Sequence, residues 1–414
     1  MEVSTGCRTE EAARQVLANL ERRMEHIKSG IMTPEQDAMA CHQGTPLSEH
    51  LDRYIAHLEA KSVTPGRVHQ TRRRIERVAR DCRFVRLADL KAEPMEGWLA
   101  ARQKEKMSAG TRNVYRSSVV AFGNWCKRTS RLMNNPFANL PKANEKADPR
   151  RTRRALNEQE IARLLEVARQ RPVIDKMTIR RGKRKGQVLG KLLPKTQRRL
   201  ERLGRERALI YKTLVLTGLR KNELASLTVG QLDLDGPLPQ AELHAADEKN
   251  RQGSSIPLRT DLAADLRQWL AEKLVVLQEA ASKAKQPIPV RLPADTPLFW
   301  VADDLVRILG RDLVLAGMAR KVTDPVTGKT RIDTRDERGW TIDVHALRKT
   351  FGTLLSRRGV APRTAQAAMR HSTINLTMNL YTDPRLLDVA AAMDALPELP
   401  LKTGTPASSG QAVG

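Results

Sequence analysis

Apolar side chains recur at every third or fourth position through most of this chain, and this period constrains the fold more than any other feature. In residues 9–28, Ala12, Val16, Leu20 and Met24 are separated by charged side chains. One apolar stripe on an otherwise charged surface is typical of an amphipathic helix. The same pattern predicts four further helices in the first third of the chain, over 47–61, 64–81, 88–103 and 108–130.

The last of these helices carries the clearest start signal. Ser108 can cap its first turn, because a serine hydroxyl accepts a hydrogen bond from a backbone N–H that has no partner within the helix. We expect its apolar side chains to contribute to a core; they are Val114, Val119, Val120, Phe122 and Trp125. The four helices together predict one compact helical domain.

The second half of the chain mixes helices with one pair of short strands. Helices are predicted over 157–170, 206–218, 261–283 and 302–319. Between them, residues 241–258 alternate on both sides of a polar turn, which is typical of a β-hairpin. Helices around one small antiparallel sheet make this half α+β, so we expect a mainly α chain in two domains.

A segment without an apolar period separates the two halves. It contains prolines, asparagines and a basic run, which are typical of a linker, and its charge could let it extend along a phosphate backbone. The predicted organisation is an N-terminal helical extension (1–43), a helical domain (44–136), the linker (137–154), a second domain (155–397) and a disordered tail (398–414).

The charge balance identifies the class of partner. Lysine and arginine outnumber aspartate and glutamate by 73 to 47, which gives a net charge of +26. Such a surplus indicates a polyanion, with nucleic acid ahead of a membrane. Aromatic residues make up only 3% of the chain, which argues against binding of single strands by base stacking. Double-stranded DNA is therefore the expected partner.

Two basic stretches could contact that DNA. The arginines of 64–81 leave few positions for a core face, so this helix presents either a solvated surface or a phosphate-binding surface, with about equal weight. Residues 176–206 form either an inserted DNA-contacting hairpin and helix or a solvent-exposed excursion, and their charge favours contact. The arginines that we predict to contact DNA are Arg72, Arg73, Arg112 and Arg116.

Several other classes of protein are disfavoured. The cysteines, at positions 7, 41, 82 and 126, are far apart and lack the spacing of a zinc site or a disulfide framework. No stretch approaches the roughly 20 apolar residues of a membrane span. The acidic start of the chain also lacks the order of a signal peptide. We therefore expect a cytoplasmic protein with no metal and no membrane contact.

The stretch from His345 to Tyr381 concentrates side chains suited to phosphate-ester chemistry. His345 and Arg348 are one helical turn apart, and His371 follows a second predicted helix. Tyr381 stands just before an Asp-Pro pair that would end a helix. Each residue also has an ordinary explanation, namely a satisfied histidine, a helix-surface arginine or a half-buried tyrosine.

Two upstream cations are candidates for the same site. Arg220 follows a helix that is predicted to end at Gly218, a residue suited to the left-handed turn after a helix. A surface salt bridge with Glu223 would also explain it. Lys249 lies near the tip of the predicted hairpin, where exposed lysines are common. None of these residues identifies a site alone, but their joint order does.

This order resembles that of the tyrosine recombinases of the phage integrase family. The matching segments are TGLRKNEL with Arg220, KNRQGSSIPL with Lys249, HALR with His345 and Arg348, and RHSTINLTMNLYT with His371 and Tyr381. The helices of 44–136 are similar to the core-binding domain of the family, so the resemblance covers about residues 44–397 and implies a two-domain DNA clamp. Arg370 departs from the pattern, because a glycine usually precedes the histidine, and it could alter the turn around His371.

The resemblance implies a role for each residue, and the residue types fit these roles. Arg220 and Arg348 would clamp the phosphate, since a guanidinium donates forked hydrogen bonds to anionic oxygens. Tyr381 would be the nucleophile that forms a 3′-phosphotyrosyl bond, with His345 as its base.

The remaining residues would complete this site. Lys249 would protonate the leaving 5′-oxygen, His371 would hydrogen-bond the scissile phosphate, and Glu223 would orient the arginines and the histidine. The chemistry requires no cofactor and no metal.

The implied function is site-specific recombination that integrates or excises a mobile element, in a prokaryote or its phage. A relaxing topoisomerase of type IB would need the same chemistry, and an architectural DNA-binding protein could keep the fold without turnover. A C-terminal helix with an apolar face over 386–396 implies a homotetramer on two DNA sites, although it could instead fold back on its own domain. Host DNA-bending or directionality factors are further possible partners.

Overall fold

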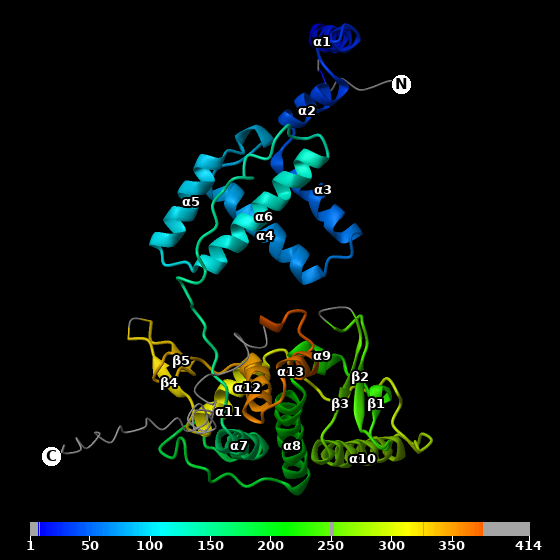
Figure 1. Cartoon of the computed structure of the whole chain (residues 1–414), viewed down its shortest axis with the longest axis vertical. Coiled ribbons are helices and arrows are strands. Elements are labelled where there is room, and N and C mark those ends of the chain that lie inside the picture. The colour runs from blue at the N-terminus through cyan, green and yellow to red at the C-terminus, as the bar shows by residue number, and fades with distance from the viewer. Residues whose placement is uncertain (1–6, 8, 249–251, 326, 376–414) are drawn as a thin grey trace, which may run out of the picture. The chain divides into compact units, whose positions relative to one another are not determined.

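The computed structural model describes residue 7 and residues 9–248, 252–325 and 327–375. The chain divides into two compact units, one that ends at Arg150 and one that begins at Arg151 (Figure 1). The finer division into five segments remains a prediction, and the predicted tail lies outside the described residues. No described helix has both the length and the apolar composition of a membrane span.

The first unit is built from helices. They are α1 (Glu10–Lys28), α2 (Pro34–Gly44), α3 (Leu47–Ala60), α4 (Pro65–Asp81), the short 3-10 helix η1 (Leu87–Asp89), α5 (Ala92–Lys104) and α6 (Ala109–Arg128). Ser108 caps α6 as predicted, by accepting a hydrogen bond from the Thr111 backbone N–H at 3.2 Å. Helix α2 lies beyond the one helix predicted in the N-terminal extension; Thr33 and Gln36 cap its start reciprocally, with Pro34 in its first turn.

Helices α3 to α6 surround one apolar core, which includes Ile75, Met95 and Phe122. Phe137 and Leu140 are buried in the same core, although they lie in the segment predicted as a linker. The packed part of this unit therefore extends beyond residue 136.

One predicted core residue of α6 is on the surface. Val119, Phe122 and Trp125 are buried and Val120 is partly buried, whereas Val114 is 42% exposed. The inward face of α6 instead includes Asn113, whose side chain donates a hydrogen bond to the Ala143 carbonyl at 2.9 Å. The prediction for Val114 is wrong. It assumed that only apolar residues face inward, whereas the buried position is taken by the neighbouring polar residue Asn113.

The second unit is α+β, as predicted. Its helices are α7 (Glu158–Met177), α8 (Pro194–Thr217), α9 (Lys221–Ser226), the 3-10 helix η2 (Val229–Gln231), α10 (Thr260–Lys283), α11 (Leu305–Leu315), α12 (Val344–Arg357) and α13 (Pro362–Met369). Its strands are β1 (Leu232–Asp233), β2 (Gln240–Leu243), β3 (Ser254–Pro257), β4 (Arg320–Thr323) and β5 (Thr330–Asp333).

The strands form two antiparallel sheets rather than one. Strands β2 and β3 are the predicted hairpin, with Ala241 opposite Ile256, and β1 pairs with the other edge of β2. Strands β4 and β5 form a separate sheet in which Lys321 pairs with Ile332. The expectation of a single sheet was wrong, because the stretch that forms the second one is rich in Thr, Asp and Gly, a composition typical of a loop.

Helix α8 is the centre of this unit (Figure 1). Its C-terminal half carries Leu209, Ile210 and Leu214 into a core that also includes the inward side chains of β2 and β3. In the basic segment 176–206, an antiparallel bridge pairs Thr178 with Val188, so a short hairpin follows α7, as in one of the two predicted alternatives. The predicted helix is not separate, because α8 begins at Pro194 and the last part of the segment is its N-terminal half. Contact of this segment with DNA remains a prediction.

Candidate active site

The candidate site begins where α8 ends. Gly218 follows this helix with a φ of 62°, in the left-handed region that glycine adopts without strain. A Cβ atom at this position would overlap the ring of Phe351, so the turn admits no side chain. The turn redirects the chain, and Arg220 becomes the N-cap residue of α9.

Glu223 fixes Arg220 from within α9. One carboxylate oxygen accepts a hydrogen bond from the Arg220 backbone N–H at 2.9 Å, and the other accepts from the guanidinium. Because Glu223 is only 2% exposed, this pair is not an ordinary surface salt bridge. Burial alone would raise the pKa of Glu223, but the hydrogen bonds with Arg220 and the charge of Arg370 lower the pKa overall, so the carboxylate stays ionised.

Arg348 links the turn before Arg220 to the end of α13, just before His371. It lies on α12 and is 1% exposed, so it is not a helix-surface arginine. One terminal N–H group donates to the carbonyl oxygen of Gly218, and the other donates to the carbonyl oxygen of Met369. The guanidinium is thus held by main-chain atoms two residues before Arg220 and two residues before His371.

The two candidate histidines are uncharged at neutral pH. Burial, with Arg153 and Arg348, lowers the pKa of His345 to about 4. Burial, with Arg348 and Arg220, lowers the pKa of His371 to about 3. Arg348 and Arg220 act on both rings, so the two histidines lie near this arginine pair. A neutral imidazole has one ring nitrogen that can accept a proton, as a general base requires.

Arg370 also belongs to this site, although the sequence did not predict that its side chain would take part. Its φ of 52° is the left-handed conformation of the glycine that is usual at this position, so the turn is retained. A residue other than glycine costs on the order of 1 kcal/mol there. Its guanidinium is 8% exposed and lies 3.4 Å from Glu223 and 3.8 Å from Glu248. The only sign of Arg370 in the sequence was that it replaces a glycine. That substitution indicated a possible change in the backbone turn, and not a role for the side chain.

Two predicted site residues, Lys249 and Tyr381, lie outside the described residues. The strands on either side of Lys249 are described. Glu248, which directly precedes it, is 4% exposed and accepts a hydrogen bond from Ser254 Oγ at 3.0 Å. The structure therefore brings together four of the six predicted catalytic residues, with Glu223, and leaves the roles of all of them as predictions.

The predicted linker contributes another residue that sequence analysis missed. Arg153 Nε donates to the carboxylate of Asp343, with both oxygens at 2.9 Å. Asp343 in turn caps α12 by accepting from the Ala346 backbone N–H at 2.9 Å. Arg153 thus binds the cap of the helix that carries His345. No local pattern could reveal this, because 190 residues separate the pair.

Comparison with known proteins gives a match for part of the chain. Residues 189–386 match the model of the phage integrase family. This segment lies within the second unit, and it is similar to that family. A search among curated proteins gave no match to the sequence.

Solved integrase structures share the fold of this chain at low identity. A lambda integrase dimer bound to a COC′ core site is 16% identical over 90% of this chain and 87% of its own, with a TM-score of 0.54. A lambda integrase tetramer bound to a Holliday junction is 16% identical over 88% of each chain, with a TM-score of 0.52. The Tn1549 transposon integrase, in complex with transposon right end DNA, is 18% identical over 84% of this chain and 99% of its own, with a TM-score of 0.51.

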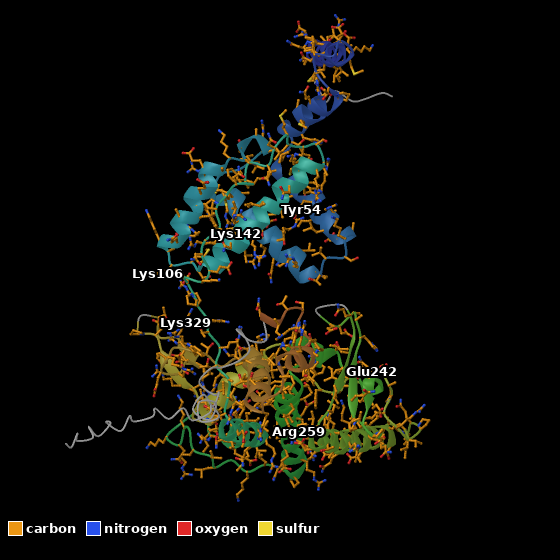
Figure 2. All side chains as sticks on the ribbon, viewed as in Figure 1. Tyr54, Lys106, Lys142, Glu242, Arg259 and Lys329 are labelled. Carbon is orange, nitrogen blue, oxygen red and sulfur yellow. The ribbon has the colours of Figure 1, made fainter. Side chains whose placement is uncertain are left out.

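The predicted DNA-contacting arginines lie in the first unit, and three of them have partners within it. Arg72 donates to Asp52 at 2.6 Å, Arg112 donates to Gln103 at 2.6 Å, and Arg116 donates to the Leu140 carbonyl at 2.6 Å. Arg73 is exposed. Side chains that end in nitrogen cover both units (Figure 2), so basic surface is widespread and these DNA contacts remain predictions.

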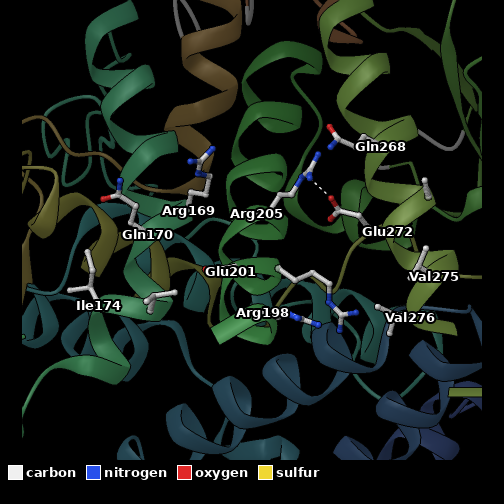
Figure 3. Close-up of a pocket in the computed structure, with 13 residues that line it drawn as sticks. Arg169, Gln170, Ile174, Arg198, Glu201, Arg205, Gln268, Glu272, Val275 and Val276 are labelled. Carbon is white, nitrogen blue, oxygen red and sulfur yellow. Dashed lines mark hydrogen bonds and ion pairs between the residues drawn. The ribbon is translucent and has the colours of Figure 1, made fainter. Parts of the chain in front are cut away.

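One groove of the second unit lies away from the candidate site. It has a volume of about 910 Å³ and is formed by side chains of α7, α8 and α10, including the ion pair between Arg205 and Glu272 (Figure 3). Helix α8 rises roughly 18 Å between Arg205 and Thr217, which directly precedes the turn to Arg220. The groove therefore does not belong to the candidate active site.

Proposed function

We propose that this chain is a site-specific DNA recombinase that cuts and rejoins duplex DNA through a phosphotyrosyl bond. The observation that carries the proposal is the convergence of Arg220, Arg348, His345 and His371 from three separate segments. Two fixed guanidiniums beside two neutral imidazoles form a site for an anion that must also exchange protons.

The arginines would stabilise the transition state of cleavage. The non-bridging oxygens of a phosphodiester are negative, and charge accumulates as a nucleophile approaches phosphorus. Arg348 is held by two carbonyl oxygens and Arg220 by Glu223, so neither guanidinium has to reorganise when the charge develops. Removal of one such donor from an enzyme typically costs about 2.7 to 4 kcal/mol of transition-state stabilisation.

Tyr381 would attack phosphorus with its phenolic oxygen. The new O–P bond replaces the bond to the 5′-oxygen, which leaves as a hydroxyl after protonation by Lys249. His345 would accept the phenolic proton. Its pKa of about 4 describes the DNA-free protein. A bound phosphate adds negative charge beside the ring and raises that pKa toward the range in which imidazole is an effective base.

The covalent intermediate would allow strand exchange without an external energy source. The phosphotyrosyl bond conserves the energy of the broken phosphodiester, so a 5′-hydroxyl from a second duplex can reverse the step. Two such exchanges recombine two sites, which would integrate or excise a mobile element on prokaryotic DNA. A homotetramer joined through the predicted C-terminal helix would hold the two sites, but this helix lies outside the described residues.

A covalent selection would test this proposal. The full chain is incubated with a pool of nicked duplexes of random sequence, and the DNA that stays attached under denaturing conditions is recovered and amplified. We expect enrichment of one sequence, an adduct that persists in EDTA, and its loss in Tyr381→Phe. No adduct with any duplex would contradict the enzymatic proposal and favour an architectural role.

A second assay would separate recombination from simple relaxation. Plasmids that carry two copies of the selected sequence should yield deletion or inversion products. Relaxed plasmid without any rearranged product would instead support the topoisomerase alternative.

A further inference from the structure

The side chain of Arg370 occupies a position that its backbone does not favour. The residue ends α13 with a φ of 52° and a ψ of 48°, a conformation that suits glycine. The guanidinium is nevertheless enclosed, with the side chain 8% exposed. Exposed residues of this chain, such as Arg83, share this conformation. Burial of the guanidinium, rather than the turn, is therefore what distinguishes Arg370.

Those contacts are the carbonyl oxygens of Thr217, Gly218 and Ala368, at 3.4 to 3.5 Å, and two buried carboxylates from different elements. Glu223 belongs to α9, and its Oε2 lies 3.4 Å from the guanidinium of Arg370. Glu248 lies in the β2–β3 connection, and its Oε1 lies 3.8 Å from Arg370 Nε. The Glu248 Oε1 atom also accepts a hydrogen bond from Ser254 Oγ. In the part of the chain that the structure describes, Arg370 is the one cation paired with Glu248.

Buried carboxylates are stable only when a cation or several hydrogen bonds compensate their charge. Glu223 already has Arg220. Glu248 depends on Arg370, which is also the group that links it to Glu223. Arg220 and Arg370 together balance the two glutamates, so the four side chains form a neutral cluster behind the site.

We propose that Arg370 is a positioning residue, which ties the base of the β2–β3 connection to the Arg220–Glu223 pair. This inference rests on the proposed function, because Glu248 directly precedes Lys249, the residue proposed to protonate the 5′-oxygen. Arg370 itself would not touch the DNA. It would determine the position of Glu248 relative to Arg220 and Arg348. Because Lys249 follows Glu248 directly, the start of the segment that carries this lysine would be positioned as well.

Unfolding of the DNA-free protein tests the ion cluster independently of any reaction. Arg370→Gly suits the backbone but leaves Glu248 without its cation, so we expect its Tm to fall by at least about 5 °C. Glu248→Gln should lower the Tm of the wild-type chain but raise the Tm of Arg370→Gly, because there it removes an uncompensated charge. Additive effects of the two substitutions would overturn the proposal.

Lys285 offers a matched control for the backbone. It is an exposed basic residue just after α10, with a φ of 53°. Lys285→Gly should leave the Tm unchanged or raise it slightly, since glycine relieves the same strain without removing a buried charge. An equal loss of Tm in Lys285→Gly and Arg370→Gly would assign the effect to the backbone and overturn the proposal.

Single-turnover cleavage of the selected nicked duplex tests positioning. We expect Arg370→Gly to lower the cleavage rate at saturating DNA by about tenfold, with at most about a threefold change in affinity, because the DNA-binding groups remain. Arg370→Lys should recover part of that rate. A wild-type rate in Arg370→Gly would overturn the inference, whereas no cleavage by the wild-type chain would instead contradict the proposed function.

Discussion

Arg348 is the largest side chain that the described part of the structure encloses fully. Both of its terminal N–H groups point to carbonyl oxygens, at Gly218 and Met369. The planar fork of a guanidinium can donate in both directions and still present N–H groups to a phosphate, whereas an ammonium is a point charge on a flexible stem. The identity of this residue therefore matters more than its charge.

Replacement of Arg348 by lysine tests this view. We expect Arg348→Lys to lower the single-turnover cleavage rate by about 100-fold or more, because the fixed donor is lost although the charge remains. Arg357→Lys, at an exposed position on the same helix, is the matched control and should cleave at the wild-type rate. Similar rates in all three proteins would show that charge alone is sufficient.

The two histidines make stability depend on pH. Their folded-state pKa values, about 4 for His345 and about 3 for His371, lie below the ordinary value of 6.5. Both rings therefore bind protons less readily in the folded state, and their contribution to stability is lost as the pH falls below 6.5. We expect the Tm to decrease on acidification from pH 6.5 toward 4, and to decrease less in a variant with glutamine at both positions. Parallel curves for the two proteins would contradict these pKa values.

At the scale of single residues, the sequence predicts which residues form the site better than it predicts their burial and their hydrogen-bond partners. The motif segments predicted Arg220, Glu223, His345, Arg348 and His371, and the structure brings these side chains together. Their burial could not be predicted, since the carbonyl partners of Arg348 come from residues 130 and 21 positions away. Arg370 was noticed only as a missing glycine, because family patterns describe the backbone turn and not the side chain that replaces it.

At the scale of secondary-structure elements, α7 and α8 pack directly against each other. Gly204 of α8 packs on the backbone of α7, where a Cβ atom would overlap the carbonyl oxygen of Arg169. The groove of Figure 3 opens between these same helices and α10. This contact fixes the helix whose C-terminal turn carries Arg220.

A methyl group at position 204 should separate the two helices. We expect Gly204→Ala to destabilise the chain by about 1 to 3 kcal/mol, the usual cost of overpacking, as measured by urea denaturation. Gly97→Ala in α5 is the control, because a Cβ atom there meets no other atom within 4 Å. It should be neutral or stabilising, since alanine favours helix over glycine. The account of this contact would be wrong if both variants behaved alike.

A buried ionic cluster joins three helices of the second unit. Asp312 of α11 is fully buried, accepts hydrogen bonds from Arg171 of α7 and Tyr211 of α8, and also lies near Arg207. These partners are 141 and 101 residues away, so no local pattern could indicate them.

Removal of this carboxylate should be costly. We expect Asp312→Asn to lower the free energy of unfolding by about 3 to 5 kcal/mol, because Arg171 would lose a buried counter-charge. Asp295→Asn, at an exposed position, should change it by less than about 0.5 kcal/mol. Equal urea midpoints for the two variants would contradict a structural role for the cluster.

The differences between the predicted and observed elements have local causes. Helix α8 is longer than its apolar pattern predicted, because its N-terminal half is basic yet composed of good helix formers after Pro194. Strands β4 and β5 are as short as β2 and β3, but the stretch that contains them is rich in Thr, Asp and Gly and has the composition of a loop. Phe137 and Leu140 lie in a proline-rich segment, so only the structure shows that they complete the core of the first unit.

For the molecule as a whole, the net charge of +26 and the two-unit organisation agree with a protein that binds duplex DNA. The second unit supplies the described part of the site, including Arg153 at its very start. The central claim is that this site makes Tyr381 a nucleophile toward DNA.

Mass spectrometry of the covalent adduct tests that claim most directly. After nuclease and trypsin digestion, cleavage at Arg370 and Arg385 releases a peptide in which Tyr381 is the only tyrosine. We predict that this peptide carries a nucleotide joined through its 3′-phosphate to the Tyr381 oxygen. A nucleotide attached to any other residue, or an unmodified peptide from an active preparation, would contradict the account.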